Sequence, residues 1–369
     1  MKKTLIALAV LAASGASFAQ VTLTGNVGFG FQKSASQTDS NANNGSGMTV
    51  VDGTINFTAR EDLGDGMSVI ASTEVQLRGR TDAVPSATNI NSNAFRPRNA
   101  TLAMITPVGV FSMGAIESPS GFFRTTSYGD NFQSGLDGAN GPWDGKTNID
   151  FVRYLVPISA LPGLQLSAWY TEVGAGVGNS FTLVNATKMT APVLMANYAA
   201  GPISAYFDYT AFSATRATGA ATTVPVFLDG VNRYRIGGDY NFGIAKVSLG
   251  YQTRDKGFAD QYAFGLTVPL GAITMNLTYG ARDATKLGTT GDAAIQAAVN
   301  PGYLSATNSS APERTGTALQ VKYSFSKTAF AEVNYATYTG GGKVGVGSFA
   351  NAQSTDYSDE YRIRLNKSF

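Results

Sequence analysis

Hydrophobic and polar residues alternate along most of the chain, in segments of roughly ten residues. Between residues 163 and 172, for example, Leu164, Leu166, Ala168 and Tyr170 alternate with Gln165, Ser167 and Thr171. Because successive side chains of a strand point to opposite sides, this pattern predicts a strand with one apolar and one polar face. The alternation, more or less regular, recurs near residues 21–32, 50–60, 68–80, 95–105, 108–116, 148–156, 190–199, 202–210, 233–242, 246–254, 260–270, 273–282, 319–325, 328–339 and 361–369. Together these segments predict about sixteen β-strands.

The connections between these segments alternate between short and long. Short polar turns are expected at residues 61–66, 106–107, 161–163, 201–202, 241–243, 270–271 and 326–327. Long connections are expected at 34–48, 81–94, 117–147, 174–189, 214–230, 284–313 and 340–356, with a shorter link near Lys256. Short turns at one end and long loops at the other are typical of an outer-membrane barrel, where a closed sheet pairs every backbone amide within hydrocarbon. The sequence therefore predicts an all-β, transmembrane antiparallel barrel wide enough for a water-filled channel.

The two ends of the chain fit this prediction. Residues 1–19 contain Lys2 and Lys3, an apolar run and a small residue at Ala19, which predicts a cleaved secretory signal peptide and a barrel domain over 20–369. The last nine residues alternate again and end on Phe369. They resemble the C-terminal signal strand of bacterial outer-membrane barrels, and that resemblance implies recognition by the barrel-assembly machinery.

Composition removes several classes of function. Without Lys2 and Lys3, the chain carries as many basic as acidic residues, which argues against a nucleic-acid partner. It contains no cysteine and no histidine, so the commonest general base and transition-metal ligand are missing. We expect no cofactor, no metal site and no catalytic residues, and we interpret acid pairs such as Glu61 and Asp62 as solvated turn carboxylates. A secreted, soluble β-sandwich remains an alternative, but it does not explain the segregated loop lengths.

Several short stretches carry family motifs. They are VTLTGNVG at 21–28, EDLG at 61–64, VGVFSMG at 108–114, NIDFVRY at 148–154, YSFSKT at 323–328 and the terminal Phe369. These stretches resemble the trimeric general porins of Gram-negative bacteria, in particular the β-proteobacterial branch. The resemblance implies a homotrimer in the outer membrane, in contact with lipid and lipopolysaccharide, that lets small hydrophilic solutes and ions diffuse passively. A substrate-selective channel for a sugar or a small anion is the alternative, although Trp169 and Tyr206, which face inward by alternation, are too few for an aromatic track.

In that family the third extracellular loop folds into the barrel and faces a basic wall. Here the corresponding segment, 117–147, is rich in glycine, and its expected constriction residues are Glu117, Arg124, Asp130, Asp137 and Asp144. The expected wall residues are Arg78, Arg80, Arg235, Arg254, Arg282, Arg362 and Arg364, with Arg98 and Arg153 in strands whose facing the alternation leaves open. The chain departs from the family at Ala115, where an arginine is common after the glycine that ends strand five.

The alternation also predicts the charge of the channel wall. The residues expected to face the lumen are Arg78, Arg80, Arg233, Arg235, Lys246, Arg254, Arg282, Lys322, Arg362 and Arg364, against the acidic Glu74, Asp208, Asp239 and Glu332. Rings of one charge in a narrow pore bias which ions pass. The excess of basic residues predicts a mild preference for anions, offset by the acids expected in the loop.

Overall fold

A computed structural model describes ten stretches of the chain. They are residues 20–33, 46–77, 95–117, 148–158, 160–174, 186–216, 229–255, 260–283, 314–339 and 360–369. The regular structure in these stretches consists of strands, and no helix among them is long and apolar enough to cross a membrane.

The strands follow one another in chain order. They are β1 (Gln20–Lys33), β2 (Ser46–Gly64), β3 (Met67–Leu77), β4 (Phe95–Thr106), β5 (Gly109–Glu117), β6 (Asn148–Pro157), β7 (Leu164–Gly174), β8 (Ala186–Ala200), β9 (Ile203–Ala211), β10 (Ser213–Arg216), β11 (Asn232–Asn241), β12 (Lys246–Arg254), β13 (Gln261–Leu270), β14 (Ile273–Arg282), β15 (Arg314–Ser324), β16 (Ala329–Thr339) and β17 (Glu360–Ser368). Both β9 and β10 pair with β8, and only Phe212 separates them, so the two segments form one barrel strand. The seventeen segments thus make sixteen barrel strands.

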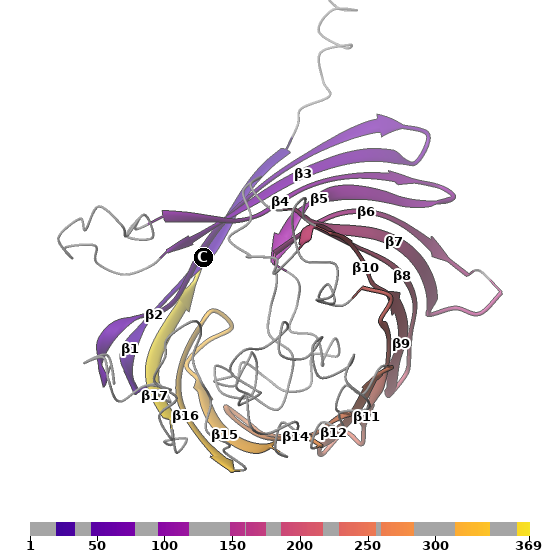
Figure 1. The fold of residues 1–369 in the computed structure, drawn as a ribbon. Helices are drawn as coiled ribbons and strands as arrows, with labels where there is room; N and C mark the ends of the chain where they lie inside the picture. The colour runs from indigo at the N-terminus through magenta and orange to yellow at the C-terminus, as the bar shows by residue number, and fades with distance from the viewer. Residues whose placement is uncertain are drawn as a thin grey trace, which may run out of the picture.

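The sheet closes on itself (Figure 1). Strand β1 pairs antiparallel with β2 on one side and with the last strand, β17, on the other. At this seam the amide of Phe369 donates to the carbonyl of Gly25 at 2.9 Å, and the amide of Gly25 donates to the carbonyl of Phe369 at 3.0 Å. A Cβ at Gly25 would lie 2.4 Å from the Thr54 carbonyl oxygen and 2.7 Å from the Phe369 ring. Closure therefore uses the last residue of the chain and requires glycine opposite it.

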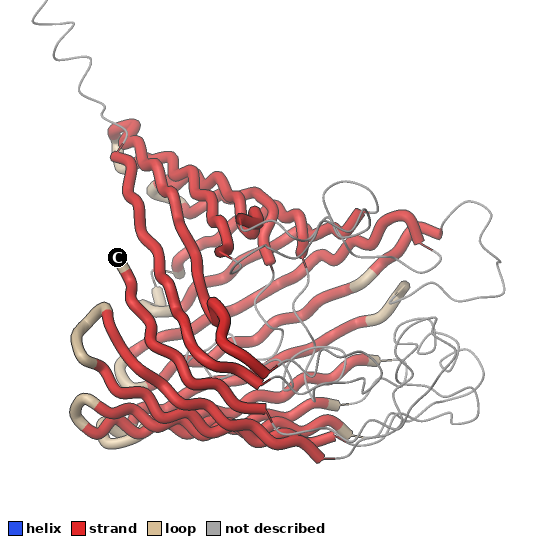
Figure 2. The backbone as a smooth tube through the Cα atoms, turned by 90° about the vertical axis from the view of Figure 1, so that its left-hand side faces the viewer, coloured by secondary structure: helices blue, strands red, loops and turns tan. Residues whose placement is uncertain are grey.

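The short turns that join consecutive strands, such as those at 64–66 and 201–202, lie at one end of the barrel (Figure 2). The turn between β2 and β3 shows why the sequence folds tightly there, because Gly64, Asp65 and Gly66 all have positive φ angles. Glycine adopts these angles without strain, and Asp62 accepts a hydrogen bond from the Gly64 amide at 2.9 Å. The strand ends that flank the longer connections lie at the opposite end. The predicted segregation of short turns to one end is confirmed.

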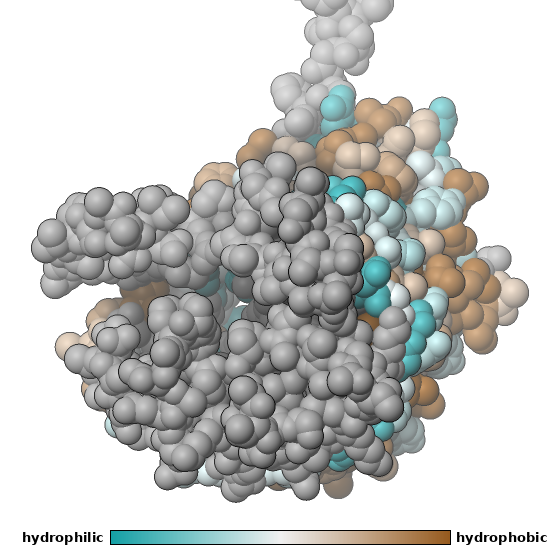
Figure 3. All heavy atoms as spheres, in the orientation of Figure 1, coloured by the Kyte–Doolittle hydropathy of each residue, from teal (hydrophilic) through white to brown (hydrophobic). Residues whose placement is uncertain are grey.

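The two faces of the wall have opposite chemistry. Large apolar side chains point outward. The exposed fractions of Leu194, Leu249 and Leu365, for example, are 58–60%. Figure 3 shows apolar residues as brown areas on the visible flank of the barrel. Polar side chains occupy the concave inner face, where Ser248, Gln252 and other neighbours are buried. This is the reverse of a soluble protein and the expected arrangement of a barrel in lipid around a polar lumen.

The strands extend further than the sequence predicted at the end opposite the turns. The connections expected at 174–189 and 214–230 are partly strand, because β8 begins at Ala186 and β10 covers Ser213–Arg216. Backbone pairing continues there, with Ser213 opposite Thr190. The short run Ser213–Arg216 is mostly polar, so its strand does not show in the hydrophobic pattern.

Candidate functional site

The structure describes the side chains of six of the arginines expected in the channel wall. Arg98 lies on β4, Arg153 on β6, Arg235 on β11, Arg254 on β12, and Arg362 and Arg364 on β17. Glu117 is the last residue of β5 and Arg282 the last of β14. The other expected residues, Arg78, Arg80, Arg124, Asp130, Asp137 and Asp144, lie outside the described residues.

One cluster of charges joins β9 and β11 on the lumen face. The register places Arg235 opposite Asp208, and Arg235 Nε lies 2.9 and 2.8 Å from the two carboxylate oxygens. Arg233 Nη2 lies 4.0 Å from the same carboxylate and donates to Thr210 Oγ1 at 3.1 Å. Asp208 is fully buried, so these guanidinium groups replace the water that its charge would otherwise need. One carboxylate thus contacts two arginines.

A second cluster joins β16 and β17. Glu332 Oε1 accepts from Arg362 Nη2 at 2.8 Å and lies 2.7 Å from Arg364 Nε. Asn334 Nδ2 also donates to Glu332 Oε1, at 2.8 Å, and Gln320 Nε2 donates to Oε2 at 3.0 Å. Again a single carboxylate holds two arginines.

A row of amide side chains continues from Glu332 across the neighbouring strands. Asn276 Nδ2 donates to Gln320 Oε1 at 2.6 Å, and Thr267 Oγ1 donates to Asn276 Oδ1 at 2.7 Å. Because these residues come from β13, β14 and β15, the row ties the inner face together from β13 to β17. Their mutual hydrogen bonds hold the polar wall in a fixed arrangement.

The structure also settles the facing of Arg98. Strands β3 and β4 have an irregular register between Glu74 and Val75. There Arg98 Nη1 donates to Glu74 Oε1 at 3.0 Å, while Asn99 Nδ2 donates to Glu74 Oε2 at 2.9 Å. Arg98 therefore reaches a carboxylate on the polar face of β3, and the two charges offset each other.

Arg153 has a different environment. Its Nε donates to Ser112 Oγ at 3.1 Å, and its guanidinium carbon lies 4.9 Å from the centre of the Trp169 ring. Trp169 in turn lies 5.1 Å from the Phe151 ring, with the two planes tilted by 43°. Among the described residues, no carboxylate forms an ion pair with Arg153. Its positive charge is therefore not offset by a contacting acid of the described wall.

The described lumen clusters hold more cations than carboxylates. Asp208 and Glu332 each contact two arginines, and Arg153 adds a further cation. In a polar channel such an excess attracts anions and repels cations. Within the described residues, no group of three or more acidic side chains is arranged to hold a metal ion.

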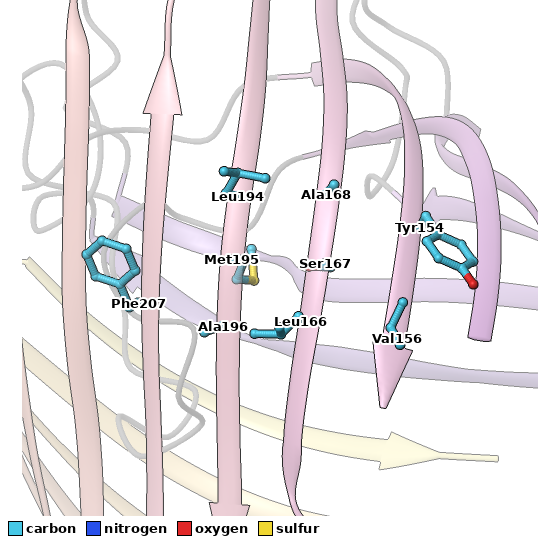
Figure 4. A pocket seen from close by; sticks show the side chains of 9 residues that line it. All are labelled: Tyr154, Val156, Leu166, Ser167, Ala168, Leu194, Met195, Ala196 and Phe207. Carbon is cyan, nitrogen blue, oxygen red and sulfur yellow. The ribbon is translucent and has the colours of Figure 1, made fainter. Parts of the chain in front are cut away.

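An apolar groove lies on the outer face, away from these charges (Figure 4). It has a volume of about 380 Å³ and is lined by Tyr154, Val156, Leu166, Ser167, Ala168, Leu194, Met195, Ala196 and Phe207, from strands β6 to β9. The small side chains of Ala168 and Ala196 leave the hollow between larger neighbours. Its lining suits hydrocarbon and does not suit a hydrophilic solute.

Sequence reasoning identified most of these residues but not their contacts. Strand alternation placed Arg235 and Glu332 on the polar face, yet it could not show which cation meets which acid, because that depends on register. Ser112 and Phe151 were missed because their segments alternate irregularly. One signal in 148–154 was that Phe151 and Arg153, two residues apart, share one face of a strand.

A closed barrel with an apolar outside and a charged, polar inside defines a β-barrel channel protein of the outer membrane. The family described as Gram-negative porin matches residues 4–343, and the chain belongs to this family. A comparison with curated protein sequences found no match.

Solved porin structures share the fold. The anion-selective porin from Comamonas acidovorans is 18% identical, with a TM-score of 0.61, over 95% of this chain and 100% of that one. A mutant of the porin from Rh. blastica is 12% identical, with a TM-score of 0.58, over 95% and 100%. In-vitro folded OmpT of Vibrio cholerae, in a trimer form, is 14% identical, with a TM-score of 0.55, over 95% and 99%.

Proposed function

We propose that this porin lets small hydrophilic solutes and ions diffuse passively across the outer membrane, with a mild preference for anions. The observation that carries the proposal is the lumen wall, on which Asp208 and Glu332 each hold two arginines and Arg153 contacts no described carboxylate. The similarity to a Comamonas porin described as anion-selective supports the same direction. No enzymatic step is part of this function.

The channel narrows, in this proposal, where the loop 117–147 meets the wall. Acids of that loop, with Glu117 at its start, would face the basic wall and moderate its preference for anions. The signal peptide 1–19 is removed on export, which leaves 20–369 as the mature barrel.

The proposed assembly is a homotrimer, since one structural neighbour is described in a trimer form. Lipid covers the rest of the outer face, and lipopolysaccharide surrounds the end with the long loops. The barrel-assembly machinery recognises the last strand and Phe369, whose backbone closes the barrel against Gly25.

The outer groove takes part of an acyl chain in this arrangement. Ala168→Leu together with Ala196→Leu would fill it, and we expect native mass spectra to retain less phospholipid on the variant trimer. Ala205→Leu is the control, because Ala205 lies on the same face of β9 as Phe207 but does not line the groove. Loss of trimers in the double variant alone would instead assign the groove to a subunit contact.

A reversal potential tests the ion preference. Detergent-folded protein is inserted into a planar bilayer between 0.1 and 1 M KCl, and the sign of the zero-current potential gives the preferred ion. We expect a chloride preference and openings in groups of three. A potassium preference would contradict the proposed effect of the basic lumen wall on ion selectivity.

A substrate-selective channel for a sugar or a small anion is the second candidate. The contact of Arg153 with Trp169 favours it, since aromatic and charged groups together can bind a permeating solute. Saturation of the flux of one solute at low concentration would distinguish it from free diffusion.

A further inference from the structure

The guanidinium of Arg153 has a fixed orientation with one side left for a ligand. Its Nε is occupied by Ser112 Oγ at 3.1 Å, and Trp169 lies under the group at 4.9 Å. Among the described residues, no side chain accepts a hydrogen bond from its two Nη groups. A guanidinium held by its Nε and one face presents its Nη edge, which matches the two oxygens of a carboxylate.

The other basic clusters of the described wall differ at this point. Arg235 Nε binds both oxygens of Asp208, and Arg362 and Arg364 share Glu332. Arg98 binds Glu74. In each of these clusters, a carboxylate of the protein already occupies part of the position that a carboxylate ligand would need. Arg153, by contrast, contacts the Trp169 ring and forms no ion pair with a described carboxylate.

The surroundings of Arg153 are also apolar. Trp169 packs against Phe151 at 5.1 Å, and the register places Val193 of β8 opposite Trp169 on the same inner face. Trp169 remains half-buried, so part of its surface borders the lumen. Aromatic rings gain additional stabilisation from edge and offset contacts with other rings. A ligand held by its carboxylate at Arg153 therefore meets an aromatic surface.

We propose that Arg153, Trp169 and Phe151 form a subsite in the channel for small aromatic carboxylates, with benzoate as the simplest example. The carboxylate accepts hydrogen bonds from the Nη groups of Arg153, and the ring packs against the exposed part of Trp169. Ser112 is a positioning residue, because it holds Arg153 by its Nε. This inference rests on the proposed channel function and names the class of solute that the channel would bind in transit.

Single-channel recording with benzoate tests the subsite. Increasing benzoate at constant ionic strength and neutral pH should add brief, concentration-dependent blocks to the current. Acetate supplies the carboxylate alone and benzyl alcohol the ring alone, so each should block at least about threefold more weakly at equal concentration. Equal effects of benzoate and acetate would overturn the proposal, since the ring would then contribute nothing.

Three variants and a control separate the parts of the site. Trp169→Leu should weaken benzoate block about threefold to tenfold while leaving the acetate effect unchanged. Arg153→Met should weaken benzoate block at least tenfold. Arg153→Lys should retain only part of the benzoate block, because lysine lacks the planar guanidinium group. Tyr170→Leu changes the neighbouring aromatic on the outer face, exposed at 47%, and should behave as the unmodified protein. An unchanged benzoate block in Trp169→Leu would refute the role of the indole.

The open-channel current keeps the two proposals apart. If the pore conducts salt but benzoate does not block it more than acetate does, the subsite is wrong and the diffusion channel stands. If correctly folded trimers conduct nothing, the proposed function itself fails.

Discussion

Replacement of Glu332 by glutamine should make the channel more selective for anions. Glu332 Oε1 lies 2.8 Å from Arg362 Nη2 and 2.7 Å from Arg364 Nε, so the carboxylate offsets part of the charge of these two residues. Glu332→Gln keeps the size of the side chain and one acceptor oxygen but removes the negative charge. Both arginines would then act on passing ions without the opposing charge of Glu332.

The size of the effect follows from Coulomb's law. An ion that passes ~5 Å from the charge in water has an interaction energy of ~0.8 kcal/mol, which screening at 0.1 M salt lowers to ~0.5 kcal/mol. The substitution removes an attraction for potassium and an equal repulsion for chloride. The permeability ratio of chloride to potassium should therefore rise about fivefold. In 1 M salt the same calculation leaves a change of less than about twofold.

Reversal potentials under small salt gradients, centred on 0.1 M and then on 1 M KCl, measure this ratio. Arg153→Met removes a cation from the wall and should shift the ratio by a similar factor toward potassium. The reasoning is refuted if Glu332→Gln leaves the ratio unchanged at low salt, or if both variants shift it in the same direction. A shift that persists undiminished at 1 M would show that the effect is not a screened charge.

Three further substitutions test the barrel itself. Gly25→Leu puts side-chain atoms where the Phe369 ring lies, so the folded band on an unheated gel should be lost. Gly47→Ala, with nothing within 4 Å of its Cβ, is the control and should fold normally. Folded Gly25→Leu protein would contradict the described contact between Gly25 and Phe369 at the seam. Leu249→Arg places a charge on the lipid face of β12 and should cost about 2–4 kcal/mol in urea unfolding. Leu249→Met, which keeps this position apolar, should cost less than about 1.5 kcal/mol; equal costs would mean that this face of β12 does not meet lipid. Phe369→Ala removes the terminal ring and should lower the amount of protein in outer-membrane fractions, and an unchanged amount would argue against its role in assembly.

Most of the fold follows from the sequence because its physics is local. Strand alternation needs only the period of two, and lipid on one side with water on the other makes that period visible over about ten residues at a time. The turn at Gly64, Asp65 and Gly66 is equally local, since its positive φ angles require these residue types. The run Ser213–Arg216 escaped detection because its mostly polar side chains do not follow the apolar alternation.

The contacts within the lumen follow from register, which alternation does not determine. A sequence can place Arg362, Arg364 and Glu332 on one face of their strands, but only the pairing of β16 with β17 brings them together. The same holds for Arg153, whose neighbours Ser112 and Trp169 come from the strands on either side. The constriction expected at 117–147 stays a prediction, because its residues after Glu117 lie outside the described residues.

Swelling of proteoliposomes tests the central claim most directly, since it follows uncharged solutes through the channel without reference to its charges. Liposomes that contain the folded protein are diluted into isotonic solutions of sugars of increasing size. The account predicts swelling that slows smoothly with solute size and rises in proportion to the amount of protein, without saturation. No swelling with the smallest sugar, from protein that is folded and heat-modifiable, would contradict a water-filled diffusion channel.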